Sequence, residues 1–392
     1  MRLPYQYFAH LPLKPLLPVA TRPHLVSSLT VPLTLSYAPL SSMISLGLTC
    51  QGEKGTRYRL VRPLGTQIHG KRPNVWLAVD GSNDTAEYIV KRQPDDETNV
   101  GESPSHALLA FKHELEMQRL FEKSPMIRKL VDFIPDSEPG GPMMVLEAFT
   151  DSLWEARNAR PFTTKEIKWI MKGVLLGIFT VHMKGLVYTG KGEVLKSCPS
   201  MSFGLVLTLT PDLKMENVAL GGFDHSKPRE NICELIVRLV DCGSITKPST
   251  REVTSLTYRS PEVHFGKSWT QSTDVWSWGI ILAQLLQAQV DPKSPGMYDS
   301  TSTGTLEDKT KAVRDKLAID FDLASIPFYA EDKECAKNLP SPQPEEAYMW
   351  ANDMVEKGVA GEDIQFLVGV LNPDPNARLT VPEILESGYL EC

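Results

Sequence analysis

The sequence lacks the cysteine spacing of a disulfide framework or a zinc site. Its six cysteines are scattered and form no C-x-x-C motif; they stand at positions 50, 198, 233, 242, 335 and 392. The eight histidines are scattered as well, and none has metal-ligand spacing. Unpaired, dispersed cysteines are typical of proteins kept in a reducing compartment. We therefore expect a cytoplasmic or nuclear protein without structural disulfides or bound zinc.

An excess of positive charge is also missing. The 392 residues carry a net charge of −7, which argues against a protein that binds nucleic acid by neutralising phosphates. With 42% hydrophobic and 23% charged residues, the chain can bury a large core. These values favour a globular enzyme, which we expect to be monomeric and to bind no nucleic acid.

The first 57 residues contain no acidic residue before Glu53. Such a composition is found in transit peptides, but the many prolines oppose an amphipathic helix. The uncharged run 25–52 is long enough to span a membrane, yet Pro32, Pro39 and the dense Ser and Thr argue against it. We expect residues 1–57 to be a disordered extension or an incorrectly assigned start, with mitochondrial targeting as the alternative and no membrane contact.

Residues 212–217 read D-L-K-M-E-N, and their chemistry is that of phosphoryl transfer from ATP. An Asp (Asp212) can orient and deprotonate the attacking hydroxyl. A Lys two residues on (Lys214) can neutralise the γ-phosphate, and an Asn five residues on (Asn217) can hold Mg²⁺. The hexapeptide alone occurs by chance, so its meaning depends on the motifs that follow it.

Four further motifs follow in order: V-D-C-G at 240–243, T-Y-R-S-P-E at 257–262, D-V-W-S-W-G at 274–279 and N-P-D-P-N-A-R-L-T at 372–380. Taken singly, Asp-Cys-Gly is usually a turn and Ser-Pro-Glu a helix start. Together with D-L-K-M-E-N, they resemble the signatures of the eukaryotic protein kinase family. The resemblance implies that Asp241 chelates Mg²⁺, and that Glu262 and Arg378 form a buried ion pair.

A β-hairpin is predicted by two apolar runs, 75–79 and 87–91, with the turn cluster 80–84 between them. Lys91 ends the second run, where kinases keep the Lys that grips the α- and β-phosphates. Its partner would be a Glu on the next helix. We favour Glu114 over Glu116 because Met117 and Leu120 would then face the interior.

The phosphate-covering loop is the weakest match to the family. Gly65 takes the place of the first glycine of G-x-G-x-x-G-x-V and Val75 that of the final Val, but the second glycine is absent and the loop is a few residues too long. Further on, the apolar run 143–149 resembles the hinge. There Leu146 would lie behind the adenine, while the backbones of Glu147 and Phe149 would bind its edge.

The catalytic loop is interrupted. The run G-L-V-Y-T at 185–189 begins this loop as in kinases, but 22 residues, 190–211, separate it from Asp212. The two ends of this segment can be encoded by consensus splice-site sequences, G|GTAAG at the start and CCAG|AT at the end. Joining the flanking nucleotides restores the Asp codon. The L-T-L-T repeat at 207–210 can encode a branch point. A retained intron is our interpretation, with a genuine loop insertion as the alternative; insertions usually occur at exposed tips.

Tyr188 and Thr189 replace the usual His-Arg before the catalytic Asp. In many kinases that Arg binds a phosphate on the activation segment, which Thr189 cannot do. A Thr here is similar to the SR-protein kinases, whose segment is ordered without phosphorylation. Cys242, where Phe is usual, would fill the same apolar slot.

By resemblance, the fold class is α+β, a bilobal protein-kinase-like fold with a β-rich N-lobe at about 58–147 and a mainly helical C-lobe at about 148–390. Helical periodicity over 164–182, 272–288 and 345–371 supports the second part independently.

The implied activity is transfer of the ATP γ-phosphoryl group to Ser or Thr hydroxyls of a protein, with ATP and Mg²⁺ as cofactors. Lys214 favours Ser/Thr specificity. The alternative is a pseudokinase scaffold that binds partners with weak or no catalysis. A small-molecule kinase is disfavoured by the S-P-E motif at 260–262, which in protein kinases shapes the peptide-binding ledge.

Overall fold

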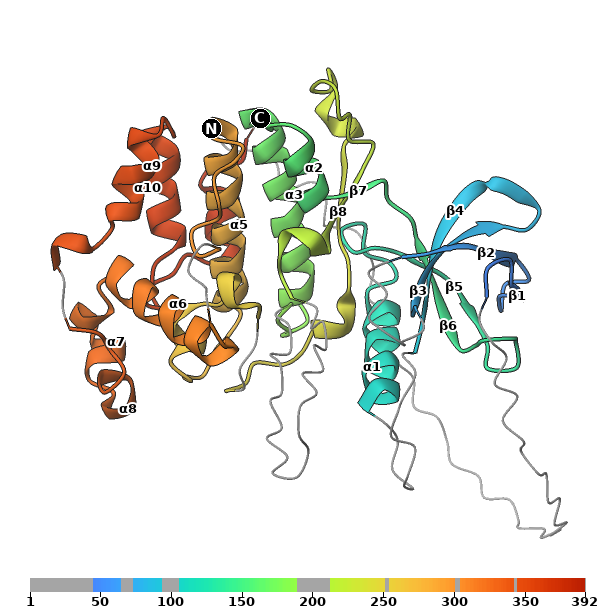
Figure 1. Ribbon diagram of the computed structural model, residues 1–392, viewed down its shortest axis with the longest axis horizontal. Coiled ribbons are helices and arrows are strands. Elements are labelled where there is room, and N and C mark those ends of the chain that lie inside the picture. Colours follow the sequence, from blue (N-terminus) through green and yellow to red (C-terminus); the bar gives the residue numbers. More distant parts are fainter. Residues whose placement is uncertain are drawn as a thin grey trace, which may run out of the picture. The chain divides into compact units, whose positions relative to one another are not determined.

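An antiparallel sheet of six strands forms the N-terminal lobe, in the order β1-β2-β3-β4-β6-β5 (Figure 1). The computed structural model describes residues 45–64, 73–93, 106–188, 212–250, 254–299, 304–341 and 344–391. The strands are β1 (Thr49–Gln51), β2 (Arg57–Pro63), β3 (Val75–Asp80), β4 (Asn83–Arg92), β5 (Leu130–Ile134) and β6 (Met143–Glu147). Alternation along β2 buries Tyr58 and Leu60 in a core beneath the sheet, as expected of a half-buried strand.

The predicted hairpin is confirmed as β3 and β4. The turn between them is held by Asp80, whose carboxylate accepts a hydrogen bond of 2.8 Å from the backbone N–H of Ser82. The register sets Val75 opposite Lys91. The hairpin therefore fixes the position of Lys91 at the end of β4.

The sheet begins before the predicted boundary at residue 57. β1 pairs with β2, and Cys50 lies 1% exposed in the core beside Tyr58. A strand of three residues with one buried side chain carries too little alternation to be recognised in an uncharged stretch. Residues 1–44 of the predicted extension lie outside the described residues.

Helix α1 (His106–Leu120) lies beside the sheet (Figure 1). Phe111 joins a cluster with Leu130, Met144 and Leu146. Met117 is buried as predicted, but the prediction for Leu120 was wrong, because this side chain is 45% exposed. Leu120 is the last residue of the helix, and Phe121 takes the interior position instead.

The C-terminal lobe is mainly helical (Figure 1). Its helices are α2 (Leu153–Ala159), α3 (Thr164–His182), α4 (Pro261–His264), α5 (Ser272–Val290), α6 (Leu306–Asp320), α7 (Pro327–Ala330), α8 (Lys333–Ala336), α9 (Met349–Glu356), α10 (Gly361–Val370) and α11 (Val381–Glu386). A capping box starts α3, where Thr163 and Glu166 satisfy each other's backbone N–H groups. The fully buried Trp276 and Trp278 mark α5 as the central helix of this core.

The predicted helices at 164–182 and 272–288 are confirmed as α3 and α5. The predicted run 345–371 is instead divided into α9 and α10. Gly358, with φ of 100°, stops α9 in a left-handed conformation that favours glycine.

A small antiparallel sheet of β7 (Asp151–Ser152), β8 (Val218–Gly221) and β9 (Ile236–Leu239) positions the segments that carry Asn217 and Asp241. Val218 pairs with Leu239, and the N–H of Val240 donates to the carbonyl of Asn217 at 3.0 Å. The residues that precede β8 are thereby brought next to those that follow β9.

Candidate active site

Lys91 occupies the centre of a charged cluster. Its Nζ lies 2.8 Å from the Glu114 carboxylate and 3.2 Å from Oδ1 of Asp241. Burial disfavours the ammonium, but Asp241 and Glu114 outweigh it, so the pKa of Lys91 lies above its ordinary value. The positive charge is therefore retained at neutral pH. Glu116, the alternative partner, is exposed on the other side of α1.

Asp241 reaches this cluster through an unusual backbone conformation. Its φ is 65°, in the left-handed region that non-glycine residues seldom adopt, just before the short helix η3 (Cys242–Ser244). α1 packs on η3, and Nε2 of His113 lies 2.8 Å from the carbonyl oxygen of Ile245. Strain of this kind persists where the surroundings enforce it, commonly at functional sites.

Asp212 begins the loop that leads to β8. Its side chain is fully buried; Oδ2 accepts a hydrogen bond from the backbone N–H of Ser255, and Nζ of Lys214 lies 3.6 Å from Oδ1. Nδ2 of Asn217 donates to the carbonyl of Asp212 at 2.6 Å across the short helix η1 (Met215–Asn217). Asp212, Lys214 and Asn217 thus lie together.

Asp274 anchors the end of α3 and the segment that leads to Tyr188. Its Oδ2 lies 2.8 Å from Nε2 of His182 and accepts the N–H of Tyr188 at 2.8 Å. The buried Tyr188 donates its hydroxyl to the carbonyl of Val240, and its own carbonyl accepts from Ser244 at 2.8 Å. Burial raises the pKa of Tyr188 well above its ordinary value, so the hydroxyl stays protonated as a donor. Sequence reasoning had identified Asp274 only as the opening of α5.

The run 143–149, predicted to be the hinge, consists of β6 and the two residues after it. Leu146 is fully buried, and the N–H of Glu147 donates to the carbonyl of Lys129 at 3.0 Å, so this N–H is already used within the sheet. Phe149 lies against Gly221, where an added Cβ would stand 3.2 Å from its ring. The close approach explains a glycine at the end of β8. Of the predicted cofactor-binding residues, Gly65 lies outside the described residues, as does the insertion 190–211.

Asn217 and Asp241 offer oxygen atoms of the kind that Mg²⁺ prefers. Because Nδ2 of Asn217 is committed to Asp212, the amide oxygen is the atom suited to a metal. Across the part of the chain that the structure describes, no group of three or more His, Cys, Asp or Glu could hold a metal ion. A two-residue donor set fits Mg²⁺, which is usually held by one or two side chains together with substrate phosphates.

Glu262 and Arg378 form the expected ion pair in the interior. Nη1 and Nη2 of Arg378 lie 2.8 and 2.9 Å from the two carboxylate oxygens, and both side chains are 0% exposed. The guanidinium also lies over the ring of Trp276, 5.1 Å from its centroid. The pair joins the end of the activation segment to the loop before α11.

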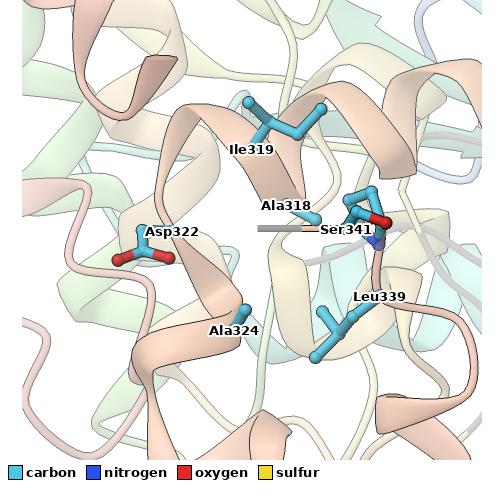
Figure 2. A pocket seen from close by; sticks show the side chains of 7 residues that line it. Ala318, Ile319, Asp322, Ala324, Leu339 and Ser341 are labelled. Carbon is cyan, nitrogen blue, oxygen red and sulfur yellow. The ribbon is translucent and has the colours of Figure 1, made fainter. Parts of the chain in front are cut away.

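Two hollows in the C-lobe are lined by none of the residues named above as candidate site residues. A cavity of about 10 Å³ (Figure 2) has room for roughly one water molecule. It is lined by Ala318, Ile319, Asp322, Ala324, Leu339, Pro340 and Ser341. A surface groove of about 350 Å³ is lined by Lys267, Ser268, Thr270, Phe328, Pro375 and Asn376.

Comparison with known proteins matches residues 209–390 to the protein kinase domain. The chain is 26% identical over 242 residues to cyclin-dependent kinase F-2 of Oryza sativa subsp. japonica, covering 60% of each chain. It is 26% identical over 293 residues to the serine/threonine-protein kinase SRPK of Physarum polycephalum, covering 63% of this chain and 64% of that one. A dual specificity protein kinase of Schizosaccharomyces pombe is 30% identical over 145 residues, 34% of this chain and 18% of that protein.

The α+β bilobal fold, the ordered motifs and these relatives agree. Together they support the eukaryotic protein kinase family, whose domain matches residues 209–390. The chain spans about 60% of the length of the first two relatives.

Proposed function

We propose that the protein is an active serine/threonine kinase that transfers the γ-phosphoryl group of ATP to protein hydroxyls. The observation that carries the proposal is the ion-paired Lys91 between Glu114 and Asp241, because these three come from β4, α1 and the segment after β9. Lysine side chains are usually exposed, because water solvates the ammonium group. Stability alone therefore does not require three separate elements to bring a lysine between two carboxylates. The arrangement supports a phosphate-binding site.

Each residue has a role that its position supports. Asp212 would orient the substrate hydroxyl and accept its proton, with Lys214 nearby to neutralise charge on the transferred group. Lys91 would grip the α- and β-phosphates, while Glu147 and Phe149 would meet the adenine edge with their backbones. Asn217 and Asp241 would hold Mg²⁺, which when bound neutralises charge that develops on the phosphates.

The test is incorporation of phosphate from Mg-ATP into a generic protein substrate by the full chain. We expect Asp212→Ala to lower the rate by about 10²- to 10⁴-fold, the usual contribution of a general base. Asp224→Ala is the matched control, since this aspartate bonds to Ser226 outside the cluster. Equal rates for Asp212→Ala and the unaltered protein would contradict the proposal.

A pseudokinase is the second candidate, and one observation favours it. The carboxylate of Asp212 is fully buried, with Oδ2 already engaged by the N–H of Ser255, so a substrate hydroxyl must displace this contact. A pseudokinase would bind nucleotide or partners without phosphate transfer. Nucleotide binding with no transfer by the unaltered chain would favour this candidate.

Protein substrates and a cytoplasmic or nuclear location belong to the same proposal. None of the described helices is long and apolar enough to cross a membrane.

A further inference from the structure

His113 lies on α1 directly before Glu114, and neither the sequence motifs nor the proposed function gives it a role. Its Nε2 lies 2.8 Å from the carbonyl oxygen of Ile245, in the segment 241–250 that begins with Asp241. A carbonyl oxygen only accepts, so Nε2 of His113 carries the hydrogen and donates it. The bond joins residues 132 positions apart and links α1 directly to this segment.

Two consecutive residues of α1 hold the segment at two places. Glu114 pairs with Lys91 at 2.8 Å, and Nζ of Lys91 lies 3.2 Å from Oδ1 of Asp241. His113 binds the segment at Ile245, on the other side of η3, against which α1 packs. Consecutive side chains of an α-helix project in directions about 100° apart. Contact by one of them leaves the helix free to turn about its axis, whereas contact by both also fixes its rotation.

The segment that receives this bond is itself anchored to the C-lobe. The N–H of Thr246 donates to the carbonyl of Val187 at 3.0 Å, and the N–H of Val187 donates to the carbonyl of Thr246 at 2.8 Å. Oγ of Ser244 donates to the carbonyl of Tyr188 at 2.8 Å. Ile245 lies between these two attachments and is fully buried in the C-lobe core. Its carbonyl is therefore a fixed point, and the bond that it accepts connects α1 to that core.

A single hydrogen bond is weak beside the stability of the whole chain but strong beside a local equilibrium. Loss of one neutral hydrogen bond changes an equilibrium constant by up to about tenfold. The same tenfold change, about 1.4 kcal/mol, is a small part of the free energy that keeps a domain folded. For a helix that turns between a paired and an unpaired orientation, such a bond sets the two populations without deciding whether the protein folds.

We propose that His113 is a positioning residue that keeps α1 turned toward the segment 241–250, so that Glu114 stays paired with Lys91. The inference rests on the proposed function, in which Lys91 grips the phosphates of ATP. His113 acts through Glu114 and Lys91 and is not a catalytic residue. Without its bond, α1 turns away from the segment more often, and the fraction of molecules with Lys91 in place falls.

The experiment compares the full chain with three variants of His113 and one control. His113→Gln keeps an N–H at the same number of bonds from Cα as Nε2 of histidine, His113→Asn places it closer to Cα, and His113→Leu removes it. Lys112→Leu is the matched control, because this neighbouring side chain on α1 is exposed. Three quantities are measured: amide hydrogen exchange of α1 without nucleotide, the thermal unfolding midpoint, and kcat for phosphate transfer from Mg-ATP to a generic protein substrate.

We expect His113→Leu and His113→Asn to raise the exchange rate of α1 and to lower kcat, each by about tenfold. The midpoint should fall by no more than about 2 °C. His113→Gln should stay within about threefold of the unaltered protein, because its amide can replace the bond. Lys112→Leu should change none of the three quantities.

Rescue by glutamine separates the hydrogen bond from the packing of the ring. Equal effects of His113→Gln and His113→Leu would overturn the inference, and so would an exchange rate or a kcat that does not change in His113→Leu. A midpoint that falls by more than about 5 °C would also overturn it, since His113 would then support the whole fold.

Hydrogen exchange keeps this inference separable from the proposed function. If the unaltered protein transfers no phosphate, the proposed function fails, and the exchange rates alone decide for His113. Faster exchange of α1 in His113→Leu, with rescue in His113→Gln, then retains the link from α1 to Ile245, and equal exchange rates overturn it.

Discussion

Substituting Arg378 by methionine should destabilise the C-lobe more than almost any other single change. Besides the two contacts to Glu262, the guanidinium donates to backbone carbonyls of Asn372 at 2.7 Å, Ser272 at 2.9 Å and Pro373 at 3.3 Å. Methionine leaves the Glu262 carboxylate buried with no counter-charge and removes one donor from each of three carbonyls. Breaking a buried pair by removing one partner costs about 3–5 kcal/mol. For a chain of this size the thermal midpoint should fall by roughly 5 °C.

The assay is chemical or thermal unfolding followed by circular dichroism. Arg238→Met is the control, because among the described residues the side chain of this arginine donates only to the neighbouring Val237 carbonyl, at 2.9 Å. The double variant Glu262→Met/Arg378→Met removes both charges, so it should be more stable than Arg378→Met alone. A loss of less than about 1 kcal/mol in the single variant would refute the reasoning, since it would mean that water reaches the pair. A double variant no more stable than the single one would assign the cost to lost packing.

Two further predictions follow. His264 is buried near Arg259 and Arg314, and burial together with these charges holds its pKa well below the ordinary value. The unfolded chain, whose His pKa is about 6.5, then binds more protons than the folded one, so stability is lost as pH falls. Between pH 7.5 and 5.5 the loss from this group should be about 1.4 kcal/mol and absent in His264→Gln; equal pH profiles of the two proteins in denaturant titrations would contradict it. For the insertion 190–211, sequencing of cDNA across the codons for 185–217 should show that 66 nucleotides, three for each of 22 codons, are missing; their presence in the mature transcript would reject the retained intron and favour the pseudokinase.

Much of the fold could be predicted because the local patterns of apolar and turn residues match the strands and helices that form. The β3–β4 hairpin has apolar alternation on both sides of a turn cluster, and α3 and α5 have sustained helical periodicity. The boundary near residue 57 failed because β1 is short. The division of α9 from α10 was missed because an apolar period continues across Gly358, whose effect lies in its backbone conformation alone.

The candidate site, like the fold, could be predicted only in part from the sequence. Lys91, Asp212, Asn217 and Asp241 lie in recognisable motifs, and the pairing of Lys91 with Glu114 was chosen from helix periodicity. The contacts of Asp274 with His182 and Tyr188 were missed because they join residues more than 80 positions apart, and no local sequence pattern indicates such a contact.

The pairing of β8 with β9 sets the distance between Asn217 and Asp241 independently of the number of residues between them in the sequence. Asn217 and Asp241 are 24 residues apart in the sequence, yet the Val218–Leu239 pair and the Asn217–Val240 hydrogen bond fix their approach. The arm between the strands, residues 222–235, lies beyond the far end of this ladder. Phe223, Ile232 and Leu235 of this arm are buried in the C-lobe core, whereas residues 225–228 at its tip are exposed. The length of this tip can therefore change over evolution, or be altered in the laboratory, without shifting Asn217 and Asp241. The tip is an attachment point for a new recognition element or a reporter.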